Sequence, residues 1–227
     1  MQNQFEMGYT FSPEEIQKAT TPKYRAFLKE AGYVDLEETP SLFVANKVLN
    51  IDERVLKTAK EADITLNLYN HDSVISRINH KNALCLIHNL GGRVLTVRLM
   101  YNLFIPSLKE LAEQGNAEAK TTLDEMTNKT AEWLEDLILD GNKVRIGTAE
   151  RTLELPQKDG YFNRADINKF GYPKVINDDK GEYHYWFPRN KEGAIVRVMG
   201  SRLDLDLSRS PFSSYDGGLG VRFAKFF

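Results

Sequence analysis

Hydrophobic and polar residues alternate along residues 201–210, which read SRLDLDLSRS. Successive side chains of a β-strand point to opposite faces, so this pattern predicts a strand with one buried face. The core face would hold Leu203, Leu205, Leu207 and Arg209. The opposite face and the polar loop that follows would present the candidate ligand-binding residues Arg202, Asp204, Asp206, Ser208, Ser210, Phe212, Ser213, Ser214, Tyr215 and Asp216.

Helix signals dominate the chain before residue 127. A capping box at residues 12–15 and a second Thr-Pro start at residues 21–22 predict two short helices within residues 1–32. Residues 51–62 have a helical pattern, whereas residues 64–69 alternate like a strand.

Three more helices are predicted between residues 82 and 126. Asn82 and Thr96 are the expected N-caps of the first two, which end at Gly91-Gly92 and at Gly115. The third is more polar and covers residues 116–126. Pro106 has no N–H to donate, so it should kink or split the helix predicted for residues 97–113.

After Trp133 the pattern changes to short strands separated by turn signals at residues 140–141, 158–160, 178–181 and 190–193. Helices first and strands last favour an α+β fold with a short-stranded antiparallel sheet toward the C-terminus. We expect an N-terminal helical extension at residues 1–50 and a main domain at residues 51–227.

Composition and charge narrow the classes of partner. The chain has 227 residues with 30 Lys and Arg against 32 Asp and Glu, a net charge of −2, and neither sign forms a block. A nucleic-acid partner is not expected, because binding to phosphates needs clustered basic residues. No run is apolar enough to insert in a membrane, and no classical export signal opens the chain, so a soluble protein is expected.

Residues with reactive side chains form no recognised catalytic or metal motif. The four histidines, His71, His80, His88 and His184, lack zinc-site spacing, and Asp204-x-Asp206-x-Ser208 imitates a calcium loop without its glycine and final glutamate. Cys85 lies among apolar residues and is expected to be a small core residue. We therefore expect no enzyme activity, no cofactor and no metal, although an ion held by backbone carbonyls has no signature in the sequence.

Three separated stretches resemble one known family. Residues 82–96 (NALCLIHNLGGRVLT), residues 131–136 (AEWLED) and the closing RVMGS, Arg209, Pro211 and LGVRFAK are similar, in order and spacing, to the formylglycine-generating-enzyme-like branch of the C-type lectin fold. The resemblance covers roughly residues 72–227 and implies that Trp133 is a core residue. The paired cysteines of the enzyme members are missing, as are the sugar-binding motifs of the calcium-dependent lectins.

What remains is similar to the variable proteins of diversity-generating retroelements, above all to archaeal and viral members. The resemblance implies a ligand-binding display protein whose variable region lies at about residues 200–218. Mutagenesis of template adenines in AAC or AAT codons cannot produce Lys, Glu, Gln, Met or Trp, and residues 200–218 contain none of these.

The expected partner is a protein or a cell-surface ligand, as for receptor binding by a virus. A patch of about ten residues is small for an interface, so multivalent display, possible on a virion, would be needed for firm attachment. The alternative is a non-diversified interaction or virion structural module of the same fold, and an enzyme with a relocated site is a third class.

Overall fold

The computed structural model describes residues 33–35, 42–48, 53–64, 66, 78–128, 131–140, 142–147, 149–189, 193–200, 202–209 and 219–226. The two helices predicted within residues 1–32 and most of the strand predicted for residues 64–69 lie outside these ranges. Six candidate site residues also lie outside them: Ser210, Phe212, Ser213, Ser214, Tyr215 and Asp216.

The helices predicted after residue 50 are present. They are α3 (Glu53–Glu61), α4 (His80–Asn89), α5 (Val97–Leu99), α6 (Ile105–Glu113) and α7 (Ala117–Asn128). One start was predicted wrongly, because the cap of α4 is Asn79, whose side chain accepts from the backbone N–H of Asn82. The expected end at Gly91 is confirmed by its positive φ of 78°, a conformation that glycine adopts readily.

Helices α5 and α6 belong to one continuous helical segment with a π-helical stretch, η1 (Met100–Phe104), between them. Thr96 caps the start, as predicted, and accepts from the N–H of Leu99. Pro106 lies in the first turn of α6. A proline cannot donate a helical hydrogen bond, and the helix changes its hydrogen-bond pattern just before that residue. The expected interruption therefore takes the form of a π-helical turn.

The main sheet has the strand order β5-β4-β3-β8-β9-β7-β6, with β10 paired to β3 beside this path. Its strands are β3 (Ala131–Asp140), β4 (Lys143–Ile146), β5 (Ala149–Thr152), β6 (Gly160–Phe162), β7 (Tyr183–Trp186), β8 (Ala194–Met199), β9 (Asp204–Arg209) and β10 (Leu219–Gly220), and a short 3-10 helix, η2 (Arg164–Asp166), follows β6. The expectation of an antiparallel sheet is wrong at two pairs, since β7–β9 and β10–β3 are parallel. After its hairpin with β8, β9 lies between β8 and β7, and this placement makes it run parallel to β7. The α+β class is confirmed.

A second sheet joins distant parts of the sequence. Strand β2 (Leu42–Val48) pairs with β1 (Tyr33–Asp35) on one side and with β11 (Arg222–Phe226) on the other. The boundary that the sequence suggested at residue 50 therefore separates two strands that pair in the structure. Val44 of β2 is completely buried in the same core as residues of the main sheet. Residues before 50 thus contribute to the main domain.

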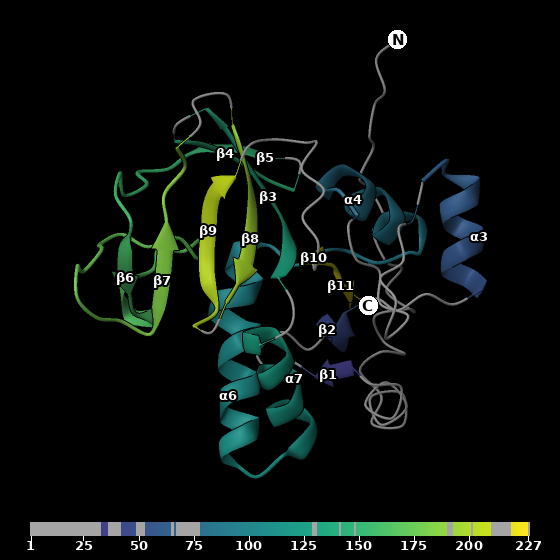
Figure 1. The fold of residues 1–227 in the computed structure, drawn as a ribbon, viewed down its shortest axis with the longest axis horizontal. Coiled ribbons are helices and arrows are strands. Elements are labelled where there is room, and N and C mark those ends of the chain that lie inside the picture. The colour runs from purple at the N-terminus through teal and green to yellow at the C-terminus, as the bar shows by residue number, and fades with distance from the viewer. Residues whose placement is uncertain are drawn as a thin grey trace.

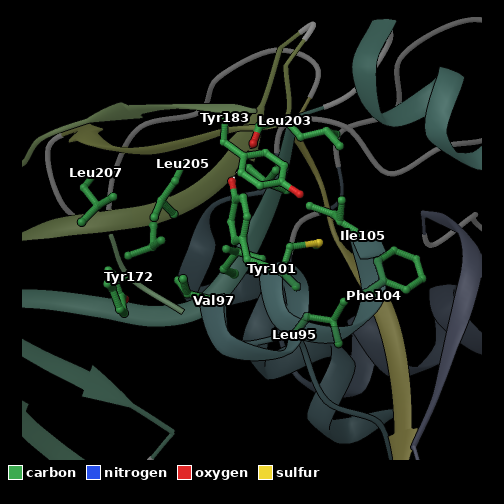
Figure 2. Close-up of a cluster of buried hydrophobic side chains, with 14 of the residues drawn as sticks. Leu95, Val97, Tyr101, Phe104, Ile105, Tyr172, Tyr183, Leu203, Leu205 and Leu207 are labelled. Carbon is green, nitrogen blue, oxygen red and sulfur yellow. Dashed lines mark hydrogen bonds between the residues drawn. The ribbon is translucent and has the colours of Figure 1, made fainter. Parts of the chain in front are cut away.

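Two hydrophobic clusters cover different parts of the sheet. The larger one packs α6 and η1 against one face, and it includes Leu203, Leu205 and Leu207 together with Tyr101 and Tyr172 (Figure 2). The smaller one packs α4 against Trp133 and Leu137 of β3 and Ile195 of β8. Figure 1 shows β6 and β7 on the side of the molecule away from α3 and α4. None of the helices that the structure describes is long and apolar enough to cross a membrane.

Candidate functional site

Strand β9 divides its side chains between two faces of the sheet, as the alternating pattern predicts. Leu205 and Leu207 have no exposed surface and lie in the larger core. Asp204, Asp206 and Ser208 point the other way, toward a surface that we call the outer face: the side of β6, β7 and β9 opposite the larger core. The predicted core position of the leucines is confirmed; the side chain of Arg209 lies outside what the structure describes.

A hydrogen bond from a buried tyrosine fixes the turn that leads into β9. Leu203 is 3 % exposed and has a positive φ of 55°, unusual for a residue other than glycine. Its N–H donates to the carbonyl of Gly200 at 3.0 Å. Its own carbonyl accepts from the hydroxyl of Tyr101 at 2.7 Å, and both side chains are drawn in Figure 2. The core therefore fixes the point from which Arg202 and Asp204 project.

Three aromatic rings lie in a row on the outer face, and we call them the aromatic row: Tyr161 of β6 and His184 and Trp186 of β7. The rings of Tyr161 and His184 are 4.8 Å apart and nearly perpendicular, and those of His184 and Trp186 are 4.5 Å apart. All three side chains are half-buried. Their neighbours in sequence, Phe162, Tyr183 and Tyr185, are buried in the larger core. The row therefore presents ring surface to solvent from a rigid support.

Two of the predicted site residues lie at the ends of the aromatic row. The guanidinium of Arg202 lies 5.2 Å from the centre of the Tyr161 ring, which is a cation–π distance. At the other end, the indole N–H of Trp186 donates to Oδ2 of Asp204 at 3.3 Å. Burial raises the pKa of the Asp204 carboxyl, although the Trp186 hydrogen bond, His184 and Arg202 act in the opposite direction. Asp204 thus carries its charge in a partly desolvated position.

Asp206 corrects the expectation that every polar residue of β9 faces solvent. It is 3 % exposed, and its Oδ2 accepts from Nε of Arg197 at 2.7 Å. Its other oxygen, Oδ1, accepts from the N–H and the hydroxyl of Ser208 at 2.8 and 2.7 Å. The cause is the neighbouring strand, because Arg197 of β8 is the register partner of Asp206. Asp206 is therefore a structural residue.

The structure thus brings together three of the predicted site residues and adds others. Arg202 is exposed, and Asp204 and Ser208 are half-buried on the outer face. The three residues of the aromatic row were not predicted from the sequence. A signal was present in the alternation Tyr-His-Tyr-Trp at residues 183–186. It could not show that β7 would lie beside β9, because the connection between these two strands passes through β8.

The three stretches that carry the family resemblance meet in the structure and contribute residues to the smaller cluster. Arg93 and Ala224 exchange backbone hydrogen bonds of 2.8 and 2.9 Å, and the N–H of Glu135 donates to the carbonyl of Leu95. Arg222 forms a buried, two-pronged pair with Glu132 at 2.6 and 2.9 Å. Trp133 is 1 % exposed, which confirms that it is a core residue.

A buried carboxyl lies in this region at the start of the helix that contains Pro106. Oδ2 of Asp136 accepts from the N–H of Val97, the first residue of α5. Burial is the main cause that raises the pKa of Asp136 to about 7, and the charge of Glu135 adds to it. Glu135 itself pairs with Arg93 at 3.7 Å. Asp136 joins the helix start to β3, and Asp136 and Glu135 are both buried, whereas Arg93 is exposed.

Metal-ligating and nucleophilic side chains do not gather within the described residues. No group of three or more His, Cys, Asp or Glu side chains there is placed to hold a metal ion. His80 is buried rather than on a helix surface, since its Nε2 lies 2.7 Å from the carbonyl oxygen of Leu134. Cys85 is half-buried and packs against the smaller cluster. Among the described residues, the outer face offers the aromatic row, the exposed Arg202 and the half-buried Asp204 and Ser208, which are groups suited to binding.

Comparison with known proteins adds no relative on which a function could be based. No family model matches the chain, and neither a curated protein nor a solved structure matches it significantly.

Proposed function

We propose that this chain is a ligand-binding display protein with a C-type lectin fold. Its binding surface is the outer face of β6, β7 and β9, and a retroelement diversifies the codons of residues about 200–218. The ligand is a protein or another cell-surface group. The chain acts as an attachment module, displayed in several copies on a particle such as an archaeal virion, and performs no catalysis.

The division of β9 into two faces is the observation that carries this proposal. Leu205 and Leu207 of β9 have no exposed surface, whereas Asp204 and Ser208 reach the surface; in the turn before β9, Leu203 is 3 % exposed and Arg202 is exposed. Exposed substitutions usually change stability by about 0.5 kcal/mol or less, while truncation of a buried leucine costs roughly 2–5 kcal/mol. A binding surface of this kind tolerates variation at alternate positions of one strand.

The lectin fold itself is supported by where the similar stretches lie. Residues 82–96, 131–136 and 219–225 are distant in sequence, and they contact one another through Arg93, Glu132 and Arg222. Residues that a family shares in this way are those that hold a fold together. Their meeting favours the family resemblance over a chance similarity of short motifs.

Sequencing of the gene's neighbourhood and of many copies of the locus tests diversification. We expect an adjacent reverse transcriptase gene, a near-identical template repeat that ends at the codons for LGVR, and changes at Arg202, Asp204 and Ser208. We expect Leu203, Leu205 and Leu207 to stay constant. Changes spread evenly over these leucines as well would contradict the proposal.

A matched pair of libraries tests the same surface in the laboratory. One library randomises residues 202, 204 and 208, and its control randomises residues 203, 205 and 207. Most members of the first should fold, as judged by resistance to proteolysis, and selection on an immobilised protein should yield binders. The control should yield few folded members. Equal folding in both libraries would show that β9 is not divided as proposed.

One observation favours the second candidate, an interaction module of the same fold that is not diversified. Asp206 lies within the proposed variable stretch, yet it is buried and paired with Arg197. Its replacement would leave a buried guanidinium without its carboxylate, which costs about 3–5 kcal/mol. Under the diversification proposal, functional copies of the locus should therefore keep Asp206 while residues 204 and 208 change. A locus without template repeat or variation would favour the second candidate.

A further inference from the structure

Building on the proposed function, we propose that the outer face captures its protein ligand by a cationic side chain, an arginine or a lysine. The geometry places this side chain on the ring face of Trp186, next to the Asp204 carboxylate that accepts the indole N–H. This names the chemistry of the ligand, which the display function alone leaves open.

The aromatic row is a surface that can attract a cation. The faces of aromatic rings carry negative partial charge and attract guanidinium and ammonium groups. Tyr161, His184 and Trp186 lie in contact across β6 and β7, at ring distances of 4.8 and 4.5 Å. All three residues are half-buried, so each keeps part of its surface exposed. A cation on this surface would stay hydrated on the side that faces solvent, and the rings would attract it electrostatically.

The chain itself places one guanidinium on this row. Arg202 lies 5.2 Å from the centre of the Tyr161 ring, and its charge also acts on Asp204. The contact shows that the row accepts a guanidinium at the surface in this geometry. It also occupies the Tyr161 end, so that Trp186 is the ring left for a ligand.

The negative charge of Asp204 favours a positively charged group on the ligand. The two carboxylates of this face differ in their partners: Asp206 is paired with Arg197 at 2.7 Å, whereas Asp204 accepts from the neutral indole N–H of Trp186. Within the described residues, Asp204 forms no ion pair. Burial raises the pKa of Asp204, so its negative charge is poorly solvated and would gain from a cation brought by the ligand.

An anionic side chain of a ligand would be repelled at this position. It would face the ring surface of Trp186 and the carboxylate of Asp204, and both repel it. Arg202 lies over the Tyr161 ring, and although its charge lowers the pKa of Asp204, it forms no ion pair with Asp204 among the described residues. Complementarity of charge therefore selects a basic segment of a partner protein over an acidic one.

Binding of two short peptides to the full chain tests this inference. The probes are an Arg-Gly repeat of eight residues and a Glu-Gly repeat of the same length, both with blocked ends, measured by calorimetry or by Trp fluorescence at low and at physiological salt. We expect the arginine peptide to bind at least about tenfold more tightly, and its affinity to fall as salt is raised. Failure of the arginine peptide to bind, or equal binding of both peptides, would overturn the inference.

Variants locate the effect at the proposed position. Asp204→Asn keeps an acceptor for the Trp186 N–H and removes the charge, and it should weaken the arginine peptide about fivefold. Trp186→Leu should weaken it to a similar extent. The matched control is Asp124→Asn on the exposed side of α7, which removes the same charge elsewhere and should leave affinity within about twofold.

The outcomes separate this inference from the display function. If Asp204→Asn and Asp124→Asn weaken the peptide equally, the effect is one of net charge and the inference is wrong. If library selection yields binders that need Trp186 but prefer acidic ligands, the outer face is still a binding surface and only the cationic ligand is wrong. A circular dichroism spectrum of each variant verifies that it is folded.

Discussion

The buried side chain of Arg222 joins separate elements of this molecule. Arg222 is 2 % exposed and donates to Glu132 of β3 and, through Nη1, to the carbonyl of Ala45 in β2 at 2.7 Å. Its guanidinium also lies 5.2 Å from the ring centre of Phe104. One side chain of β11 therefore contacts three other elements. Such pairs specify an arrangement, because every competing arrangement would leave a buried charge unpaired.

Replacement of one partner in this pair should be strongly destabilising. Glu132→Gln keeps the size of the side chain but leaves the Arg222 guanidinium buried without a carboxylate, and we expect a loss of about 3–5 kcal/mol in the free energy of unfolding. Urea unfolding measures it as a lower midpoint at an unchanged slope. Glu61→Gln removes an exposed pair with Lys57 and serves as the control, with an expected change of less than about 1 kcal/mol. Equal midpoints for both variants would contradict the structural role of Arg222.

Asp136 should make stability depend on pH. Burial raises its folded-state pKa to about 7, from an ordinary value near 4. The folded state therefore holds this proton more tightly than the unfolded state, and stability should fall as pH rises from roughly 4 to about 7. Asp136→Asn keeps an acceptor for the Val97 N–H, and it should flatten this dependence in urea unfolding at several pH values. An unchanged slope in the variant would show that Asp136 does not titrate in this range.

At the scale of elements, the helices and the alternating strand were predictable because their signals are local. Thr96 marks a helix start through its own side chain, and Leu205 and Leu207 mark a buried strand face through their spacing. The burial of Asp206 could not be predicted, since it depends on Arg197 in the neighbouring strand. The aromatic row could not be predicted for the same reason, because Tyr161 meets His184 only through the pairing of β6 with β7. A local sequence pattern does not show which strands, distant in sequence, will pair.

A glycine in the loop before β7 shows how closely the elements approach. Gly171 has a φ of 89°, and a Cβ there would lie 2.7 Å from the backbone of Arg98, next to the start of α5. Gly91 has a similar φ of 78°, but a Cβ there would meet nothing within 4 Å. Both positions favour glycine for its backbone conformation, and only Gly171 is also limited by space.

Gly171→Ala should therefore be more destabilising than Gly91→Ala. The alanine methyl group must displace backbone atoms at the helix start, and we expect an additional loss of about 1–3 kcal/mol. Thermal or urea unfolding of the two variants measures the difference, and the shared backbone strain cancels in the comparison. Equal losses would mean that the loop moves away from the helix without resistance.

For the whole molecule, the pairing of β2 with β11 decides where the domain begins. Val44 is completely buried in the larger core, and Ala45 accepts from Arg222. A fragment of residues 51–227 should lose both contacts, and we expect its melting temperature to fall by at least about 10 °C or its transition to lose cooperativity. A fragment of residues 33–227 keeps β1 and β2 and should unfold cooperatively. Similar melting of both fragments would restore a boundary at residue 50.

The bond between Arg222 and Ala45 also has a consequence for the time the protein needs to fold. It joins residues 177 positions apart, and contacts of such separation close slowly because the intervening chain must first lose much of its freedom. The second sheet, formed by β1, β2 and β11, should thus be the last part to form, and Arg222 should remain hydrated until that step. During refolding, protection of the β2 amides from hydrogen exchange should appear later than protection of the β3 and β8 amides.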